Sequence, residues 1–198
     1  MRLLARTFAL SGLIALGLTG CGKKEPVPDP TTQASEAPTA IQAPAMSVIK
    51  IGHVAPLSGP IAHLGKDNEN GARLAVDEIN EAGGLKVGGV TYKLVLVAED
   101  DKSDPKEGPV TAQKLVDEGV VAVVGHLNSG TTIPASKVYA QNGVAHISPS
   151  ATAVSLTEQG FNTTFRVVAR DDKQGGVLAQ FAKNHLNAKT VAIIDDRT

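Results

Sequence analysis

The segment that decides the fold is Val120-Val-Ala-Val-Val-Gly-His-Leu-Asn-Ser-Gly-Thr-Thr132. Its first five residues are apolar throughout, which is typical of a strand buried on both faces of a parallel sheet. The small and polar residues that follow predict a loop at the end of this strand, leading into a helix that begins near Ser129. A buried strand that runs directly into a helix is the repeating unit of α/β proteins.

The same alternation of strand and helix continues on both sides of this segment. Runs rich in β-branched residues predict further strands, and stretches with apolar residues at helical spacing predict the helices. The expected strands are 48–55, 91–98, 145–148, 164–168 and 190–195, and the expected helices are 65–82, 107–118, 129–141 and 172–185. The sequence therefore predicts an α/β fold in which a parallel sheet is flanked by helices on both faces.

The N-terminal residues predict export and anchoring. Arg2 and Arg6 precede an apolar run at 8–18 that is shorter than the roughly 20 residues of a membrane-spanning helix, so residues 1–20 read as a signal peptide. Cys21, directly after Leu18-Thr-Gly20, makes this a bacterial lipoprotein signal in which Cys21 carries lipid; the alternative is an ordinary signal with an incidental cysteine. Residues 21–47 then predict a disordered tether, serving as a spacer or as mere slack. We expect a protein on the periplasmic side of the cell envelope, lipid-anchored to a membrane through Cys21.

The composition argues against several function classes. The net charge is −1 without a basic stripe, which argues against nucleic-acid binding. The sequence contains no phosphate-loop, dinucleotide-binding or nucleophile-elbow motif, and its five histidines show no metal-ligand spacing. We therefore predict no enzyme, no metal and no cofactor. Asp100-Asp101 and Asp171-Asp172 follow predicted strands, where capping and loop solvation are commoner roles than acid–base chemistry.

A candidate binding site follows from the ends of the predicted strands. Ligands of parallel sheets bind beyond the carboxyl ends of the strands. Ser129 opens a helix after one strand, and Ser150 and Thr152 follow the neighbouring strand. The free N–H groups and positive dipole end of a helix favour a bound carboxylate or phosphate, and hydroxyls can add hydrogen bonds. The alternative is that Ser129 and Thr152 merely cap a helix and a turn.

Several segments, in order and at family spacing, resemble the periplasmic leucine/isoleucine/valine-binding proteins of branched-chain amino-acid ABC transporters. They are 51–60, 71–84, 99–105, 124–132, 147–152 and 165–175. The resemblance implies a type I periplasmic-binding-protein-like fold, in which two α/β lobes joined by a hinge hold the ligand between them. It also implies that Ser129 (hydroxyl), Ser150 (mainly backbone) and Thr152 (hydroxyl) hold the ligand's carboxylate and ammonium groups.

The resemblance adds Leu64 and Asn128 as candidate ligand-binding residues, and both depart from the pattern of the family. Leu64 falls where some members have a tyrosine along the ligand side chain. Asn128 and Ser103 fall where some members have two cysteines joined by a disulfide, so the resemblance implies the loop without the bridge.

The resemblance also implies that the folded part is about half as long as in the family. Residues 48–169 would form an incomplete first lobe and 170–198 the start of a second, which normally supplies an acidic partner for the ammonium group. We expect a monomeric solute-binding lipoprotein that captures a free amino acid for an ABC permease in the inner membrane, with no tight binding by this chain alone. The alternative is a ligand sensor or envelope scaffold with the same fold.

Overall fold

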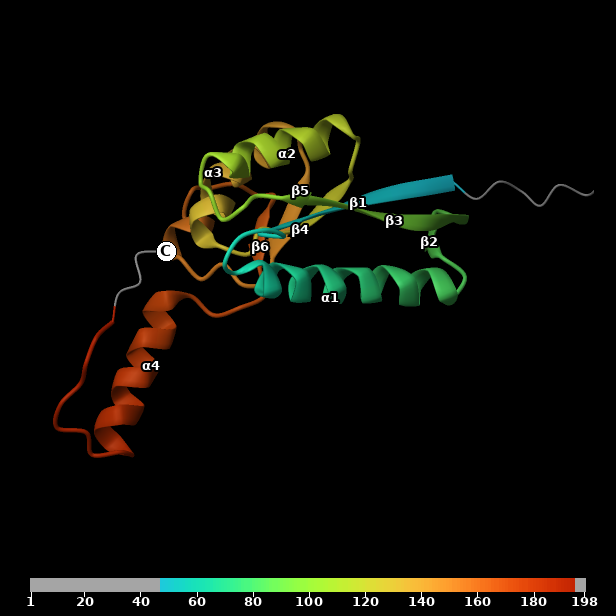
Figure 1. Cartoon of the computed structure of the whole chain (residues 1–198). Coiled ribbons are helices and arrows are strands. Elements are labelled where there is room, and N and C mark those ends of the chain that lie inside the picture. The colour runs from blue at the N-terminus through green and yellow to red at the C-terminus, as the bar shows by residue number, and fades with distance from the viewer. Residues whose placement is uncertain (1–46, 195–198) are drawn as a thin grey trace, which may run out of the picture. The chain divides into compact units, whose positions relative to one another are not determined.

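The computed structural model describes residues 47–194, which contain one six-stranded sheet and several helices (Figure 1). The strands are β1 (Ser47–Ala55), β2 (Leu85–Val87), β3 (Val90–Asp100), β4 (Ala122–Gly125), β5 (Ala145–Ser148) and β6 (Thr164–Arg166). The helices are α1 (Ala62–Glu81), α2 (Glu107–Asp117), α3 (Ser129–Gln141) and α4 (Asp171–Asn184), with a short 3₁₀ helix at Val154–Thr157. The predicted signal peptide, Cys21 and the tether up to residue 46 lie outside the described residues. Within 47–194, none of the helices has the length and apolar content to cross a bilayer.

The sheet is mixed, which corrects the prediction of a purely parallel one. The strand order is β2-β3-β1-β4-β5-β6, and neighbouring strands from β3 to β6 are parallel. β2, at the edge, pairs antiparallel with β3. Gly88 and Gly89 join these two strands with φ of 57° and 82°, as a two-residue type I′ hairpin turn requires. The three residues of β2 are too few for an alternating pattern to reveal them in the sequence.

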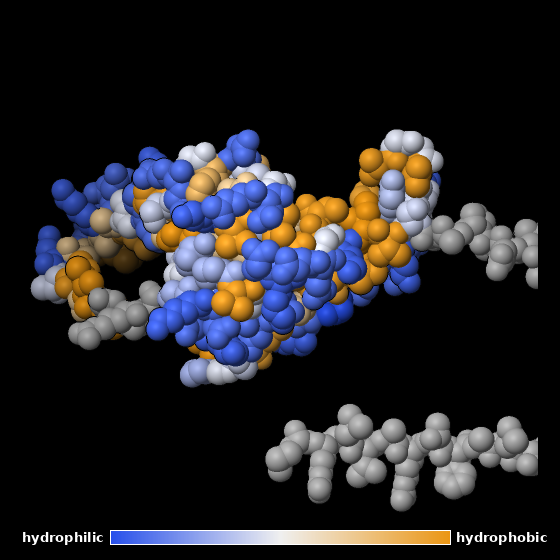
Figure 2. Space-filling model, turned by 90° about the horizontal axis from the view of Figure 1, so that it is seen from above, coloured by the Kyte–Doolittle hydropathy of each residue, from blue (hydrophilic) through white to orange (hydrophobic). Residues whose placement is uncertain are grey.

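The two faces of the sheet carry different helices. The chain moves from β1 to β3 on one side of β1, and then returns to β4, β5 and β6 on the other side. Right-handed crossovers therefore put α1 on one face and α2 with α3 on the other, as Figure 1 shows. The helices α2 and α3 pack against each other, and the surface seen over them is largely hydrophilic (Figure 2).

The main hydrophobic core lies between the sheet and the helices α2 and α3. Its buried members are Val54, Ala112, Leu115, Val120, Val123, Ala135, Tyr139 and Val144. Gly52 permits this close packing, because a Cβ atom there would stand 2.8 Å from Cδ1 of Leu115 and 2.9 Å from Cγ2 of Val123. Such packing holds the ends of β1 and β4, and the loops that follow them, in a defined position.

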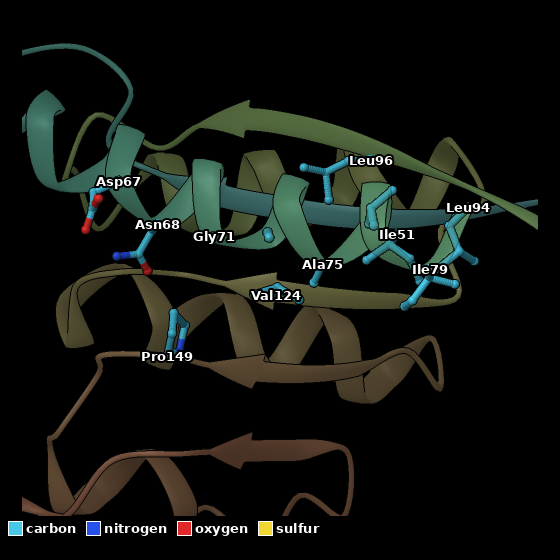
Figure 3. A pocket seen from close by; sticks show the side chains of 12 residues that line it. Ile51, Asp67, Asn68, Gly71, Ala75, Ile79, Leu94, Leu96, Val124 and Pro149 are labelled. Carbon is cyan, nitrogen blue, oxygen red and sulfur yellow. The ribbon is translucent and has the colours of Figure 1, made fainter. Parts of the chain in front are cut away.

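The opposite face of the sheet is only partly covered. α1 lies over β1 and β3, and an apolar hollow of about 500 Å³ lies between this helix and the sheet (Figure 3). Val124 lines this hollow and is the register partner of Ile147, which in turn is the register partner of Phe165. Register partners in parallel strands point to the same face of the sheet, so all three side chains lie on the face that α1 partly covers. Ile147 and Phe165 are 42% and 48% exposed. We call these two residues the open strip, since no helix of the described part covers them.

Most predicted elements are present with shifted ends, and one is wrong. α1 begins at Ala62, so Gly65 lies inside the helix rather than at its start. Glycine is needed at this position because a Cβ there would collide with the carbonyl oxygen of Pro56. The described part of the strand predicted at 190–195 forms no strand, and Ile193 and Ile194 are 92% and 91% exposed. A β-branched run becomes a strand only beside a partner that takes its hydrogen bonds, and none pairs with 190–194 among the described residues.

Candidate functional site

The candidate site lies at the carboxyl ends of the parallel strands. The chain leaves β1 toward one side of the sheet and leaves β4 toward the other, so the order reverses between these two strands. In open α/β sheets such a switch point is where ligands bind. Next to this switch point, the loops after β4 and β5 meet and, with the first residue of α4, line a hollow of about 360 Å³. Its lining residues are Leu127, Asn128, Ser129, Ser150, Thr152, Ala153 and Asp171.

The structure brings together four of the five residues predicted to bind ligand. Asn128 and Ser129 reach the hollow from the start of α3, and Ser150 and Thr152 reach it from the loop after β5. Leu64 does not line it, since it lies in the first turn of α1 with 46% of its surface exposed. A role of Leu64 toward the ligand side chain stays a prediction.

Ser129 does not cap its helix. It is the first residue of α3, and the N-cap is Asn128, in extended conformation with φ −86° and ψ 140°. The Ser129 hydroxyl oxygen accepts a hydrogen bond from the N–H of Ala153 at 3.1 Å, so its O–H group remains available as a donor. The side chain of Asn128 makes no capping bond; its Oδ1 accepts from the Ser103 hydroxyl at 3.2 Å. Positions 103 and 128 are therefore in polar contact.

Hydrogen bonds join the two loops that form the hollow. The Ser150 hydroxyl donates to the carbonyl oxygen of Leu127 at 2.8 Å, which commits this hydroxyl to the loop. The carbonyl oxygen of Thr152 accepts from the N–H of Asp171 at 3.0 Å. This contact ties the loop after β5 to the first residue of α4.

The hollow offers groups of opposite polarity. The N–H groups of Thr131 and Thr132 bond to the carbonyl oxygen of Asn128 at 3.2 and 3.0 Å, whereas the first N–H groups of a helix, here those of Ser129 and Gly130, have no intrahelical acceptor. The start of α3 therefore favours an anionic group. Among the described residues that line the hollow, Asp171 alone has an ionisable side chain.

Asp171 and the adjacent Asp172 have different surroundings, because Asp171 lines the hollow and Asp172 does not. Asp172 Oδ2 lies 2.9 Å from the Arg170 guanidinium, and this partner lowers the pKa of Asp172. Arg170 also lies 3.2 Å from a carboxylate oxygen of Glu158. The sequence marked Asp171-Asp172 only as a pair after a predicted strand, with capping and solvation as commoner roles than acid–base chemistry. The place of Asp171 at the hollow depends on how α4 meets the loop after β5.

Comparison with known proteins places the chain in a family. A profile described as periplasmic binding protein matches residues 48–198. Leu/Ile/Val-binding protein homolog 1 of Brucella abortus (strain 2308) is 44% identical over 150 residues, which are 76% of this chain and 39% of that protein. A leucine-, isoleucine-, valine-, threonine- and alanine-binding protein of Pseudomonas aeruginosa is 38% identical over 156 residues, covering 77% of this chain and 40% of that protein.

A solved structure shows the same architecture. The branched-chain amino acid transporter substrate-binding protein LivJ of Streptococcus pneumoniae, in complex with isoleucine, matches with a TM-score of 0.66 and 39% identity. The match covers 72% of this chain and 40% of that one, so the chain spans about 40% of the length of these relatives. The predicted resemblance and the predicted periplasmic-binding-protein-like fold are confirmed. By profile, identity and fold, the chain belongs to the periplasmic binding protein family, among the Leu/Ile/Val-binding proteins.

Proposed function

We propose that the protein carrying this chain captures a branched-chain or similar amino acid and delivers it to an ABC importer. The observation that carries this proposal is the hollow at the carboxyl ends of β4 and β5, where the start of α3, the two hydroxyl residues Ser150 and Thr152, and the carboxyl group of Asp171 converge. The names of the relatives, which include leucine, isoleucine and valine, support the class of ligand.

The polarity of the hollow matches the two charges of an amino acid. The ligand's carboxylate would accept hydrogen bonds from the first N–H groups of α3 and from the hydroxyls of Ser129 and Thr152. Its ammonium group would lie toward the carboxylate of Asp171, in addition to any acid that the rest of a second lobe supplies. An apolar side chain would then point away from these polar groups.

Titration with analogues tests this mode of binding. The protein is titrated calorimetrically with L-leucine, with 4-methylpentanoate, which lacks the ammonium group, and with 3-methylbutylamine, which lacks the carboxylate. We expect both analogues to bind at least about tenfold more weakly, since each loses a charge-assisted hydrogen bond. Equal affinity for leucine and either analogue would contradict the proposal.

The cellular setting is part of the same proposal. A lipid on Cys21 and a tether at 21–47 would hold the domain at a membrane on the periplasmic side, within reach of a permease in the inner membrane. Residues 48–169 would form the first lobe, and 170–198 would begin the second. The protein would act as a monomer, with Leu64 near the side chain of the ligand.

A further inference from the structure

A chain of buried polar side chains lies behind the candidate site. Asp101 follows β3, His126 follows β4, and Tyr139 belongs to α3; all three side chains are fully buried. Asp101 Oδ2 lies 2.9 Å from His126 Nδ1, and His126 Nε2 lies 3.1 Å from the hydroxyl of Tyr139. Burial of three polar groups is costly unless each is hydrogen-bonded, and here each has a partner.

The protons of this chain can be assigned. Burial alone would raise the pKa of Asp101, but the hydrogen bond from His126 holds that pKa below its ordinary value. Asp101 is thus an acceptor, so His126 carries its proton on Nδ1 and accepts at Nε2. Burial and the charge of Asp101 raise the pKa of Tyr139, so its O–H group stays a donor. Every donor then faces an acceptor.

The loop at 126–128, which carries His126, is also held through its backbone carbonyl groups. The carbonyl oxygen of His126 accepts from the Ser148 hydroxyl at 2.7 Å, and that of Leu127 accepts from Ser150. The main chain from 126 to 128 is therefore held through the His126 ring on one side and through its carbonyl groups on the other. This stretch leads directly into Ser129, the first residue of α3.

We infer that Asp101, His126 and Tyr139 form a positioning network that sets the direction of the first N–H groups of α3 and of the Ser129 hydroxyl. The three residues do not line the hollow and act through the loop 126–129. Apolar side chains could fill the same volume, but only directional hydrogen bonds set the orientation of the ring and its backbone. The inference rests on the proposed function at this site.

Tyr139→Phe tests the network, with Tyr92→Phe as matched control because Tyr92 is the other tyrosine of the chain and lies half-buried in β3. In the natural protein that contains this chain, we expect Tyr139→Phe to weaken leucine binding about tenfold, as the loss of one buried hydrogen bond to the network would. The control should change binding less than twofold. Without ligand, the amide signals of residues 127–130 should shift and exchange faster in Tyr139→Phe only.

A spectroscopic measurement checks the assignment independently. Long-range ¹⁵N couplings should show the Nδ1–H tautomer of His126 in the wild type. Asp101→Asn serves as the second variant if Tyr139→Phe does not fold, and it should likewise shift the 127–130 amides and weaken binding. If a folded variant lowers only the unfolding temperature, while affinity and these amides stay at wild-type values, the network is merely structural and the inference fails. If the wild type binds no amino acid, the proposed function fails, and the amide and tautomer signals still decide the network.

Discussion

At the scale of single residues, the candidate site depends on the few groups that face the hollow. Ser129 combines a hydroxyl that can donate with a position at the first turn of α3. Asp171 adds a negative charge at the border of the same hollow. In the proposed binding mode the two residues face different charges of an amino acid, so their substitutions should have different effects on binding.

Ser129→Ala should weaken binding of leucine, isoleucine and valine alike. A hydrogen bond to a charged group contributes about 1.5–3 kcal/mol, so the loss should be roughly ten- to a hundredfold. The three ligands should lose similar amounts because the contact is to their shared carboxylate. Calorimetric titration measures this, with the exposed Ser155→Ala as control. An unchanged affinity, or a loss for one ligand alone, would move the contact away from Ser129.

Asp171→Asn should weaken leucine binding but leave 4-methylpentanoate unaffected, because only leucine has an ammonium group. We expect a loss of about tenfold or more for leucine, since one charge-assisted contact is removed. Asp172→Asn is the matched control, because Asp172 pairs with Arg170 and does not line the hollow. A similar loss for both ligands would mean that Asp171 acts on the fold of the loop rather than on the ammonium group.

At the scale of elements, a histidine buried between β5 and α3 makes stability depend on pH. The ring of His146 in β5 lies 5.1 Å, centroid to centroid, from the ring of Tyr139 in α3, and both side chains are buried. Burial, with a smaller contribution from His126, lowers the pKa of His146 from 6.5 to about 4. Burial lowers the pKa of His53 in β1 as well.

The free energy of unfolding should therefore fall as the pH decreases from 7 to 5. In this range the unfolded chain binds a proton on His146 and the folded chain largely does not, and the lowered pKa of His53 acts in the same direction, so acid favours unfolding. His146 alone should account for about 2 kcal/mol of the difference between pH 7 and pH 5. In urea denaturation, the free energy of unfolding of His146→Gln should differ less between pH 7 and pH 5 than that of the wild type. The exposed His63→Gln should keep the wild-type difference. An equal pH dependence in His146→Gln and wild type would contradict this.

At the scale of the whole molecule, the described part leaves apolar surface uncovered. Parallel sheets are normally buried on both faces, yet the open strip of Ile147 and Phe165 is exposed. The chain spans about 40% of the length of its relatives. We therefore propose binding between two lobes only for the protein that carries this chain.

The 198-residue chain should bind the dye ANS through the open strip, because exposed contiguous apolar surface attracts such probes. Replacing Ile147 and Phe165 together by threonine should reduce the fluorescence. Replacing Val110, an exposed apolar residue on α2, should change it little. We also expect a broad thermal transition, so a sharp cooperative transition at high temperature, with no dye binding, would contradict the prediction.

Anchoring is a second prediction at this scale. Cys21→Ser should leave an uncleaved or soluble form, because the acylated thiol is the proposed attachment to the membrane. Metabolic labelling with a fatty acid, followed by fractionation, measures this. Persistent lipid label on the Cys21→Ser variant would contradict the assignment.

The sequence by itself determined the features that depend on near neighbours. The apolar run at 120–124 and the small residues after it were enough to predict a strand, a loop and a helix from Ser129. The rule that ligands bind at strand ends then selected Ser129, Ser150 and Thr152, which the structure places around one hollow. These signals are local, because periodicity and turn chemistry act over a few residues.

Only the tertiary structure decided which distant residues meet. It placed Asp171 at the hollow and Leu64 away from it, and it joined Asp101, His126 and Tyr139 across three separate elements. It also left 190–194 without a partner strand among the described residues. The physical reason is that strand pairing and buried hydrogen bonds depend on a neighbour that lies far away in the sequence, so a segment's own residues do not specify whether that neighbour is present.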